Sequence, residues 1–166
     1  MKSQPVIGKY TIVHEDVQLG ENVTIGSFCH IHEGVVIGDN TEIKDYVELR
    51  NGTVIGRNCV IDSRVSSSGN CSIGDGVTLR YDTIIARGVS IGDNTYVCPR
   101  VMTNNLNTGK DQIGGAHIGA NCFIGTNAVI QHGITIKNNT VIGSMAFVNK
   151  DCDSNSLYVG IPAKKK

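Results

Sequence analysis

The sequence of 166 residues lacks an excess of charge of either sign, tryptophan and any long apolar run. Its 15 Lys and Arg balance its 15 Asp and Glu, so it has no basic surplus to supply affinity for nucleic acid or anionic membranes. No apolar run approaches the roughly 18 residues of a membrane span, and the first ten residues lack the basic and apolar regions of a signal peptide. We therefore expect a cytoplasmic protein that binds neither nucleic acid nor membrane.

A strict sixfold repeat of aliphatic residues runs along most of the chain. Ser67 is the one exception before the register is lost at Thr103, and the register resumes at Ile118. A second series, two positions before each aliphatic residue, holds small side chains such as Thr41 and Val47. The aliphatic series is Ile7, Val13, Leu19, Ile25, Ile31, Ile37, Ile43, Leu49, Ile55, Ile61, Ile73, Leu79, Ile85, Ile91, Val97, Ile118, Ile124, Ile130, Ile136, Ile142 and Val148.

A period of six fits neither a helix of 3.6 residues per turn nor a plain strand of period two. It fits a short strand followed by a corner, and turn sequences such as IGDN at 37–40 supply the corners. Three such sides close a triangular coil of about 18 residues, and stacked coils pair as parallel strands about 4.8 Å apart. The sequence therefore predicts an all-β fold, a parallel β-helix of about seven triangular coils, in a single domain over residues 1–166.

The six cysteines are explained by the same register. The sequence contains no CxxC pair and no zinc-like spacing of cysteines, so we expect no metal. Five cysteines fall in the small inward series, where a thiol acts as a compact hydrophobe, whereas Cys98 lies next to a corner and is left unassigned. The five are Cys29, Cys59, Cys71, Cys122 and Cys152.

The interruption after Thr103 predicts an extruded loop near residues 104–117. Fifteen residues separate Thr103 from Ile118 where six would continue the coil, so about nine residues of a polar, Gly-rich segment must bulge out. A uniform prism has no concavity, so this loop and any subunit interface are the places for a ligand site. Outward strand positions hold apolar residues, which predicts a partner surface. They are Val36, Val54, Val60, Ile84, Met102, Phe123, Val129, Val141 and Phe147.

The motifs IGDN, IGDG, IGTNAVI and IGSMAFV resemble the hexapeptide repeats of the left-handed β-helix acyltransferases, over about residues 7–163. This resemblance implies a left-handed coil, a homotrimer, and a site for acyl-CoA in the cleft between adjacent prisms. The residues expected to bind acetyl-CoA are Gly125, Thr126, Gly143 and Ser144 in these motifs, with Pro162 and Lys164 in the ending VGIPAK.

The stretch CPRVMTNN at 98–105, with IGANCFIGTNAVI at 118–130, resembles the nucleotide-sugar N-acetyltransferases. Thr103 and Asn104 match the Thr-Asn pair of that family, and Asn105 replaces its usual Asp. The related sugar O-acetyltransferases carry a histidine early in the loop, and this chain has none there. An alcohol needs a general base, whereas an unprotonated amine attacks a thioester unaided, so the resemblance implies N-acetylation of a nucleotide-linked amino sugar.

The expected mechanism assigns a role to each of several residues. Asn104 accepts a hydrogen bond from the attacking amine and orients it, and a backbone N–H near Gly125 or Gly143 meets the developing oxyanion. His117, which closes the loop, is the candidate base, ahead of His132. Residues in the coils below the loop, where a diphosphate and a sugar would rest, are expected to bind substrate together with Asn105. They are Arg64, Arg80, Tyr81, Asp82 and Arg87.

The three early histidines, His14, His30 and His32, lie some four coils below the loop, about 19 Å away at the coil spacing. This distance is too great for a role in the reaction. Two interpretations of the three histidines stay open: they contact the nucleotide part of a substrate, or they are solvated surface residues. Three alternatives to the main hypothesis also stay open. They are a sugar O-acetyltransferase of the same fold, a metalloenzyme like the γ-type carbonic anhydrases, and a non-catalytic β-helix scaffold.

Overall fold

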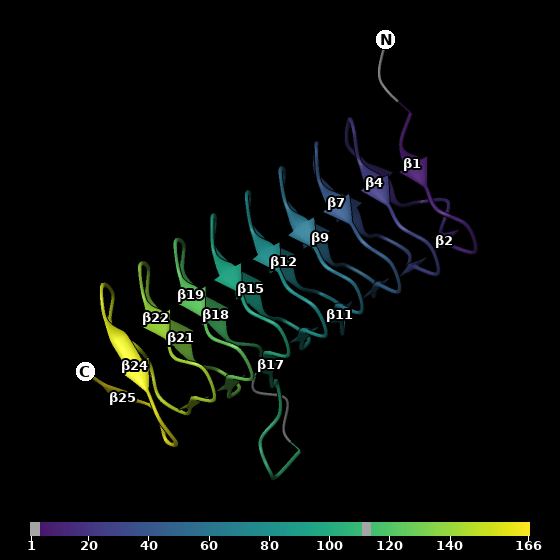
Figure 1. Ribbon diagram of the computed structural model, residues 1–166. Helices are drawn as coiled ribbons and strands as arrows, with labels where there is room; N and C mark the ends of the chain where they lie inside the picture. The colour runs from purple at the N-terminus through teal and green to yellow at the C-terminus, as the bar shows by residue number, and fades with distance from the viewer. Residues whose placement is uncertain (1–3, 111–113) are drawn as a thin grey trace.

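The computed structural model describes residues 4–110 and 114–166 of the chain. Figure 1 shows a column of stacked triangular coils, with the N-terminus at one end and the C-terminus at the other. The column has about eight coils, one more than the sequence predicted, because strand pairing continues beyond the last aliphatic slot at Val148. The expected all-β parallel β-helix is confirmed, and its left-handed sense stays a prediction.

Three sheets form the sides of the column. Sheet A contains β1 (Val6–Ile7), β4 (Thr24–Ile25), β7 (Glu42–Ile43), β10 (Val60–Ile61), β13 (Thr78–Leu79), β16 (Tyr96–Val97), β19 (Phe123–Ile124), β22 (Val141–Ile142), β24 (Leu157–Val159) and β25 (Lys164–Lys165). Sheet B contains β2 (Ile12–Val13), β5 (His30–Ile31), β8 (Glu48–Leu49), β11 (Ser66–Ser67), β14 (Ile84–Ile85), β17 (Met102–Thr103), β20 (Val129–Ile130) and β23 (Phe147–Val148). Sheet C contains β3 (Gln18–Leu19), β6 (Val36–Ile37), β9 (Val54–Ile55), β12 (Ser72–Ile73), β15 (Ser90–Ile91), β18 (His117–Ile118) and β21 (Thr135–Ile136).

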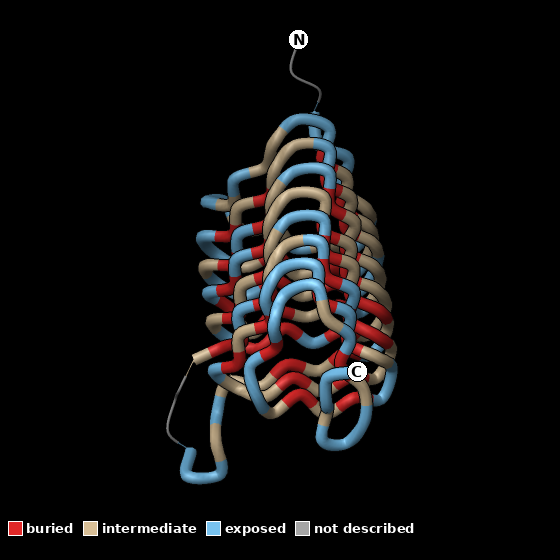
Figure 2. Tube along the Cα trace, turned by 90° about the vertical axis from the view of Figure 1, so that its left-hand side faces the viewer, coloured by how far each residue is buried: buried red, intermediate tan, exposed pale blue. Residues whose placement is uncertain are grey.

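The aliphatic slot of each strand points inward and forms the core. Figure 2 shows the buried positions along the inside of the coils, and Ile31, Ile61 and Ile130 have no exposed surface. Burying such a side chain contributes roughly 1.5–3 kcal/mol. The first coil is an exception, because Ile7 is 44% exposed and only one neighbouring coil covers it.

Most corners place one residue in the left-handed backbone region, with φ near +60°. Asparagine fills many of these positions, including Asn40, Asn94 and Asn127, because its short polar side chain tolerates that conformation. This is the physical reason for the recurring Gly-Asp-Asn turns. We call the turns leading from sheet A to sheet B the AB corner, and those leading from sheet B to sheet C the BC corner.

Two hydroxyl side chains occupy core slots in place of aliphatic residues. Ser67 is 4% exposed, and its Oγ lies 2.7 Å from Thr53 Oγ1 and accepts from the Arg50 amide at 3.1 Å. Thr103 is 2% exposed, and its hydroxyl donates to Ile84 O and accepts from the Ala86 amide. Each hydroxyl has hydrogen-bond partners, so the break in the aliphatic series costs the core little.

All six cysteines are buried and free, as the register predicts for five of them. Cys98, the unassigned one, is 7% exposed. Burial raises the pKa of the Cys29, Cys59, Cys71 and Cys122 thiols, and it raises that of Cys152 to about 11. The described residues include no helix with the length and hydropathy needed to cross a membrane.

Candidate active site

The predicted loop lies at the BC corner, between β17 and β18. Strands elsewhere in sheet C pair 18 residues apart, as Ser72 does with Ser90, but Ser90 pairs with His117. The coil therefore continues unchanged while about nine extra residues leave it (Figure 1). Of the expected loop, residues 111–113 lie outside the described residues.

Asn104 begins the loop directly after β17. Its backbone N–H donates to Ile130 O at 2.9 Å, which fixes the base of the loop on the column, and its side chain is partly exposed. Asn105 follows it, and Arg87 lies at the same corner one coil earlier. The structure thus places these three predicted residues together at the BC corner.

His132 also belongs to this corner, one coil beyond Asn105. The neighbouring Gly133 amide donates to Gly114 O at 3.2 Å, where the loop returns, so His132 sits beside the base of the loop. Its Nδ1 atom is buried and has no hydrogen-bond partner among the described residues. The sequence ranked His132 below His117 because His132 lies in a corner one coil beyond the loop, whereas His117 closes the loop at an outward position.

His117 starts β18 and points outward from sheet C. Its Nδ1 lies 2.8 Å from Ser90 Oγ, and it lines a pocket of about 400 Å³ with Thr135 and Lys137. Asn104 and His117 mark the two ends of the loop, and no hydrogen bond joins them in the described part of the chain.

The glycines expected to bind acetyl-CoA lie at the AB corner. The N–H of Gly125 donates to Ile142 O and that of Gly143 donates to Tyr158 O, both at 2.8 Å. Neither N–H is free, so an oxyanion donor near these glycines has to be another amide of the same turns. A Cβ on Gly125 would come within 2.4 Å of the Ser144 nitrogen, so coil stacking alone requires glycine there.

The next amides in the same turns are different. At an earlier turn of this corner, the amide that follows the glycine is held by an aspartate of the next coil, as Ser27 N–H is by Asp45 at 2.7 Å. In the turn that contains Thr126, the position of that aspartate is taken by Ser144 of the next coil. Within residues 4–110 and 114–166, no acceptor is hydrogen-bonded to the backbone N–H of Thr126 or to that of Ser144. Thr126 and Ser144 thus present two adjacent backbone donors at the surface.

Two of the predicted phosphate-binding arginines, Arg64 and Arg80, lie below these amides at the AB corner. Arg80 donates through Nε to Asp62 at 2.9 Å and through Nη1 to the Tyr96 hydroxyl at 2.7 Å, so only part of its fork is available to a ligand. The bonds to Tyr96 and Asp62 raise the pKa of Arg80. The Arg64 guanidinium lies 5.5 Å from the centroid of the Tyr81 ring. Asp82 holds the left-handed position of the same turn.

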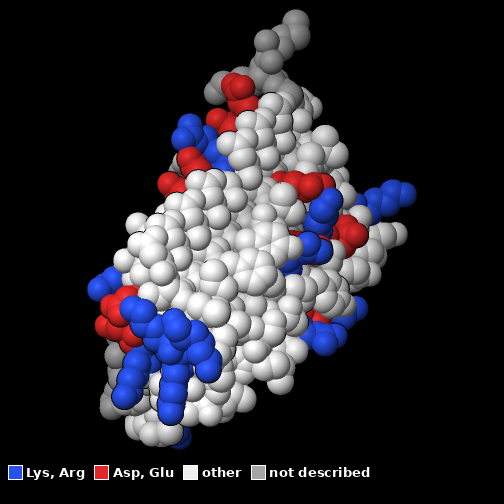
Figure 3. Space-filling view, turned by 60° about the vertical axis from the view of Figure 1, so that its left-hand side comes forward, with Lys and Arg blue, Asp and Glu red and all other residues white. Residues whose placement is uncertain are grey.

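Pro162 and Lys164 lie at the C-terminal end of the column. Pro162 follows a cis peptide bond, and β25, which contains Lys164, pairs antiparallel with β24. Figure 3 shows basic side chains gathered at the end of the column away from the N-terminus, beside a broad uncharged surface. Pro162 thus lies in the turn after β24, two coils beyond the Thr126 turn that follows β19, and Lys164 lies on the last strand of sheet A.

The structure brings His14, His30 and His32 together on sheet B. Their candidate ligand atoms all lie within 4.8 Å of one another, and His14 Nε2 is 3.3 Å from His30 Nε2. Burial, then the charges of His32 and His14, lowers the pKa of His30. The sequence treated the three separately, although a period of 18 residues stacks His14 directly on His32.

A family model described as "Bacterial transferase hexapeptide (six repeats)" matches residues 16–51, 34–66 and 115–150, more than half of the chain. The chain belongs to the hexapeptide-repeat bacterial transferase family. Galactoside O-acetyltransferase of Escherichia coli K12 is 33% identical over 85 residues, which cover 46% of this chain and 42% of the relative. A "Putative acetyltransferase" of Staphylococcus aureus strain COL is 32% identical over 95 residues, 57% of this chain and 47% of the relative.

The hexapeptide chain described here spans about half the length of these curated relatives. Among solved structures, UDP-N-acetylglucosamine O-acyltransferase of Moraxella catarrhalis has a TM-score of 0.66 at 20% identity, covering 98% of this chain and 72% of that one. The LpxA structure of Acinetobacter baumannii has a TM-score of 0.68 at 21% identity, covering 97% and 73%. At these identities the likeness shows the shared β-helix fold.

Proposed function

We propose that this protein is an acetyltransferase that moves the acetyl group of acetyl-CoA onto the amino group of a nucleotide-linked sugar. One observation carries the proposal, the polar loop set into an otherwise uniform column, with Asn104 fixed at its base. The hexapeptide family and the acetyltransferase names of the curated relatives support the reaction class. The Thr103-Asn104 pair and the lack of an early loop histidine support the amine acceptor.

In this proposal the chain acts mainly by positioning. The Asn104 side-chain oxygen accepts a hydrogen bond from the amine and aims its lone pair. The free amides of Thr126 and Ser144 serve as oxyanion donors in place of Gly125 and Gly143. As the new C–N bond forms, the C–S bond of the thioester breaks, and the CoA thiolate leaves readily and takes up, directly or through water, the proton that the amine loses.

The proposed site needs two chains. Asn104 lies at the BC corner and Thr126 lies at the AB corner, so a side of the prism separates them within one chain. In a homotrimer, the AB corner of one prism can face the BC corner of its neighbour across the cleft. Exposed apolar side chains on the outward positions, such as Phe123 at 44% and Val54 at 43%, support such an interface.

A sugar O-acetyltransferase is the second candidate. The match to galactoside O-acetyltransferase favours it, and so does His132, an imidazole beside the base of the loop that could act as a general base toward a hydroxyl. In this candidate His132 takes the role of the histidine that the related sugar O-acetyltransferases carry early in the loop.

A thiol-release assay tests both candidates. We expect CoA release from acetyl-CoA with UDP- or dTDP-linked 3-amino or 4-amino sugars, and none with the matching hydroxyl sugars. Asn104→Ala should lower kcat by about 100-fold through misplacement of the amine. Turnover on hydroxyl acceptors that disappears in His132→Ala, and not in His117→Ala, would establish the second candidate. Absence of turnover on every acceptor would reject the proposed reaction.

A further inference from the structure

The histidine cluster of the first two coils brings three imidazole side chains within reach of one ion. His14 follows β2, His30 is the outward residue of β5, and His32 follows β5. The imidazole rings are nearly parallel, with centroids 3.8 Å apart for His30 and His32 and 5.5 Å apart for His14 and His30. Two imidazole nitrogens on one tetrahedral Zn²⁺ lie about 3.4 Å apart, and His14 Nε2 and His30 Nε2 are 3.3 Å apart.

We propose that His14, His30 and His32 bind a divalent transition-metal ion, Zn²⁺ or a close analogue, and that the ion clamps the first coil to the second. Three neutral imidazoles suit such ions better than they suit Ca²⁺ or Mg²⁺, which prefer oxygen ligands. The site departs from the sequence expectation of no metal, because that expectation considered cysteine spacing and not the stacking of coils.

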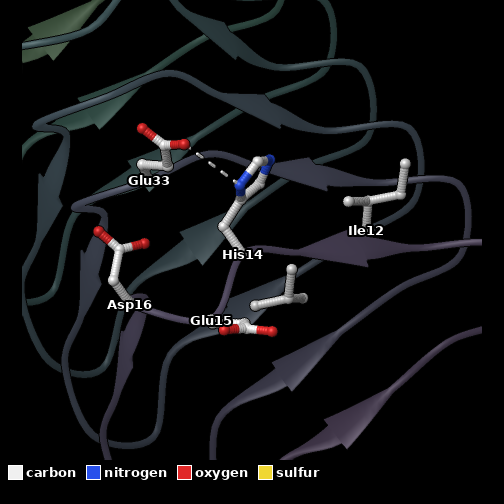
Figure 4. Close-up of a pocket in the computed structure, with 6 residues that line it drawn as sticks. Ile12, His14, Glu15, Asp16 and Glu33 are labelled. Carbon is white, nitrogen blue, oxygen red and sulfur yellow. Dashed lines mark ion pairs between the residues drawn. The ribbon is translucent and has the colours of Figure 1, made fainter.

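Two carboxylates are placed to orient the rings. His14 Nδ1 lies 3.8 Å from Glu33 Oε1 (Figure 4), so Nδ1–H can face the carboxylate while Nε2 binds the ion. His32 Nε2 lies 3.2 Å from Glu48 Oε1, which leaves Nδ1 for the ion. Carboxylates of this kind commonly hold metal-binding histidines in place. Glu48 in turn accepts from Arg50 Nε at 3.1 Å, which fixes that carboxylate.

The His14 side of the cluster is open to solvent. A pocket of about 450 Å³ opens beside His14 and is lined by Glu15, Asp16 and Glu33 (Figure 4). The side chains of His14 and His32 are 36% and 24% exposed, so an ion can reach them. The six thiols compete poorly because all are buried.

The position suggests a structural role. The cluster lies four coils from Asn104, about 19 Å at the coil spacing, and so outside the proposed active site. Terminal coils of a solenoid lack one neighbour, and here Ile7 and Ile12 are 44% and 57% exposed. An ion held by β2 and β5 would join the exposed first coil to the second.

Metal titration of the full chain, prepared without a histidine tag and stripped with a chelator, tests the site. We expect one Zn²⁺ per chain in competition with a chromogenic chelator, and a visible spectrum of tetrahedral type with Co²⁺. Binding should slow hydrogen exchange of the Ile12 and His14 amides. His14→Ala and His32→Ala should each weaken Zn²⁺ binding by more than about 100-fold, and Glu33→Gln by about 10-fold.

His117→Ala is the matched control, because it removes an exposed histidine from another sheet and should leave Zn²⁺ binding unchanged. Glu33→Gln keeps all three ligands and tests the site even if a histidine variant misfolds. The proposal is overturned if the wild-type chain takes up no Zn²⁺, or if folded His14→Ala and His32→Ala bind it as wild type does. Binding that leaves exchange in the first coil unchanged would overturn the clamp. None of these readouts depends on acetyl transfer.

Discussion

The AB and BC corners are built from the same 18-residue coil and carry different parts of the proposed site. The AB corner keeps one turn geometry from Tyr10 to Met145, with a left-handed residue in each coil. The BC corner accepts a loop at one coil and then returns to register. The comparison teaches that a repeat can offer backbone donors where it is regular and variable side chains where it is interrupted.

The largest expected effect comes from the amide of Thr126. Thr126→Pro removes the N–H, and the turn should accept it because Pro99 holds the same turn position one coil earlier, where its carbonyl accepts from Asn127 N–H. Loss of one oxyanion donor should lower kcat by about 100- to 1,000-fold. Steady-state kinetics should show that Thr126→Ala, which keeps the amide, is close to wild type. Equal activity of the two variants would remove the AB corner from the site.

A mixing experiment tests whether the two corners meet across subunits. Thr126→Pro and Asn104→Ala chains should each be nearly inactive alone. In randomly mixed trimers, about a quarter of the interfaces should combine an intact AB corner with an intact BC corner, so activity should recover to about a quarter of wild type. If mixed trimers whose composition has been verified by mass show no recovery of activity, then either both corners belong to a site within one chain or they share no site.

The regularity of the AB corner predicts a smaller effect on stability. Met145 holds a left-handed position with φ of 62° and is 58% exposed, so it gains little from burial. Met145→Asn should raise the free energy of unfolding by up to about 1 kcal/mol, because Asn tolerates this backbone region better. Asn127→Met should lower it by a similar amount. Denaturant titration measures both, and a change of the same sign in the two variants would contradict the explanation.

The smallest expected effect concerns the thiols. Burial raises the pKa of Cys152 to about 11, so at pH 8 the reactive thiolate is scarce, and access is blocked as well. Iodoacetamide at pH 8 should therefore leave mass and activity unchanged, while all six cysteines react in denaturant. Rapid modification of Cys98, a thiol of the AB corner next to the Thr126 turn, would show that this corner opens in solution.

The sequence predicted the column well because the place of a residue within the six-residue repeat decides whether it belongs to the core. Each aliphatic slot such as Ile61 is buried for the same reason as its neighbours, so the period alone places it. The site was harder to predict. The period locates Asn104 at a corner, but the hydrogen bonds that occupy the Gly125 and Gly143 amides, and leave those of Thr126 and Ser144 free, depend on which side chain lies in the coil above.

The insertion between Ser90 and His117 leaves the pairing of both with their neighbours unchanged. Length and composition of the loop after Asn104 can therefore vary without any compensating change in the column, since no core slot moves. Exchange of residues 105–113 between homologues should alter acceptor preference while melting behaviour stays the same. New acceptor specificities can therefore evolve in such proteins without a change in the stability of the column.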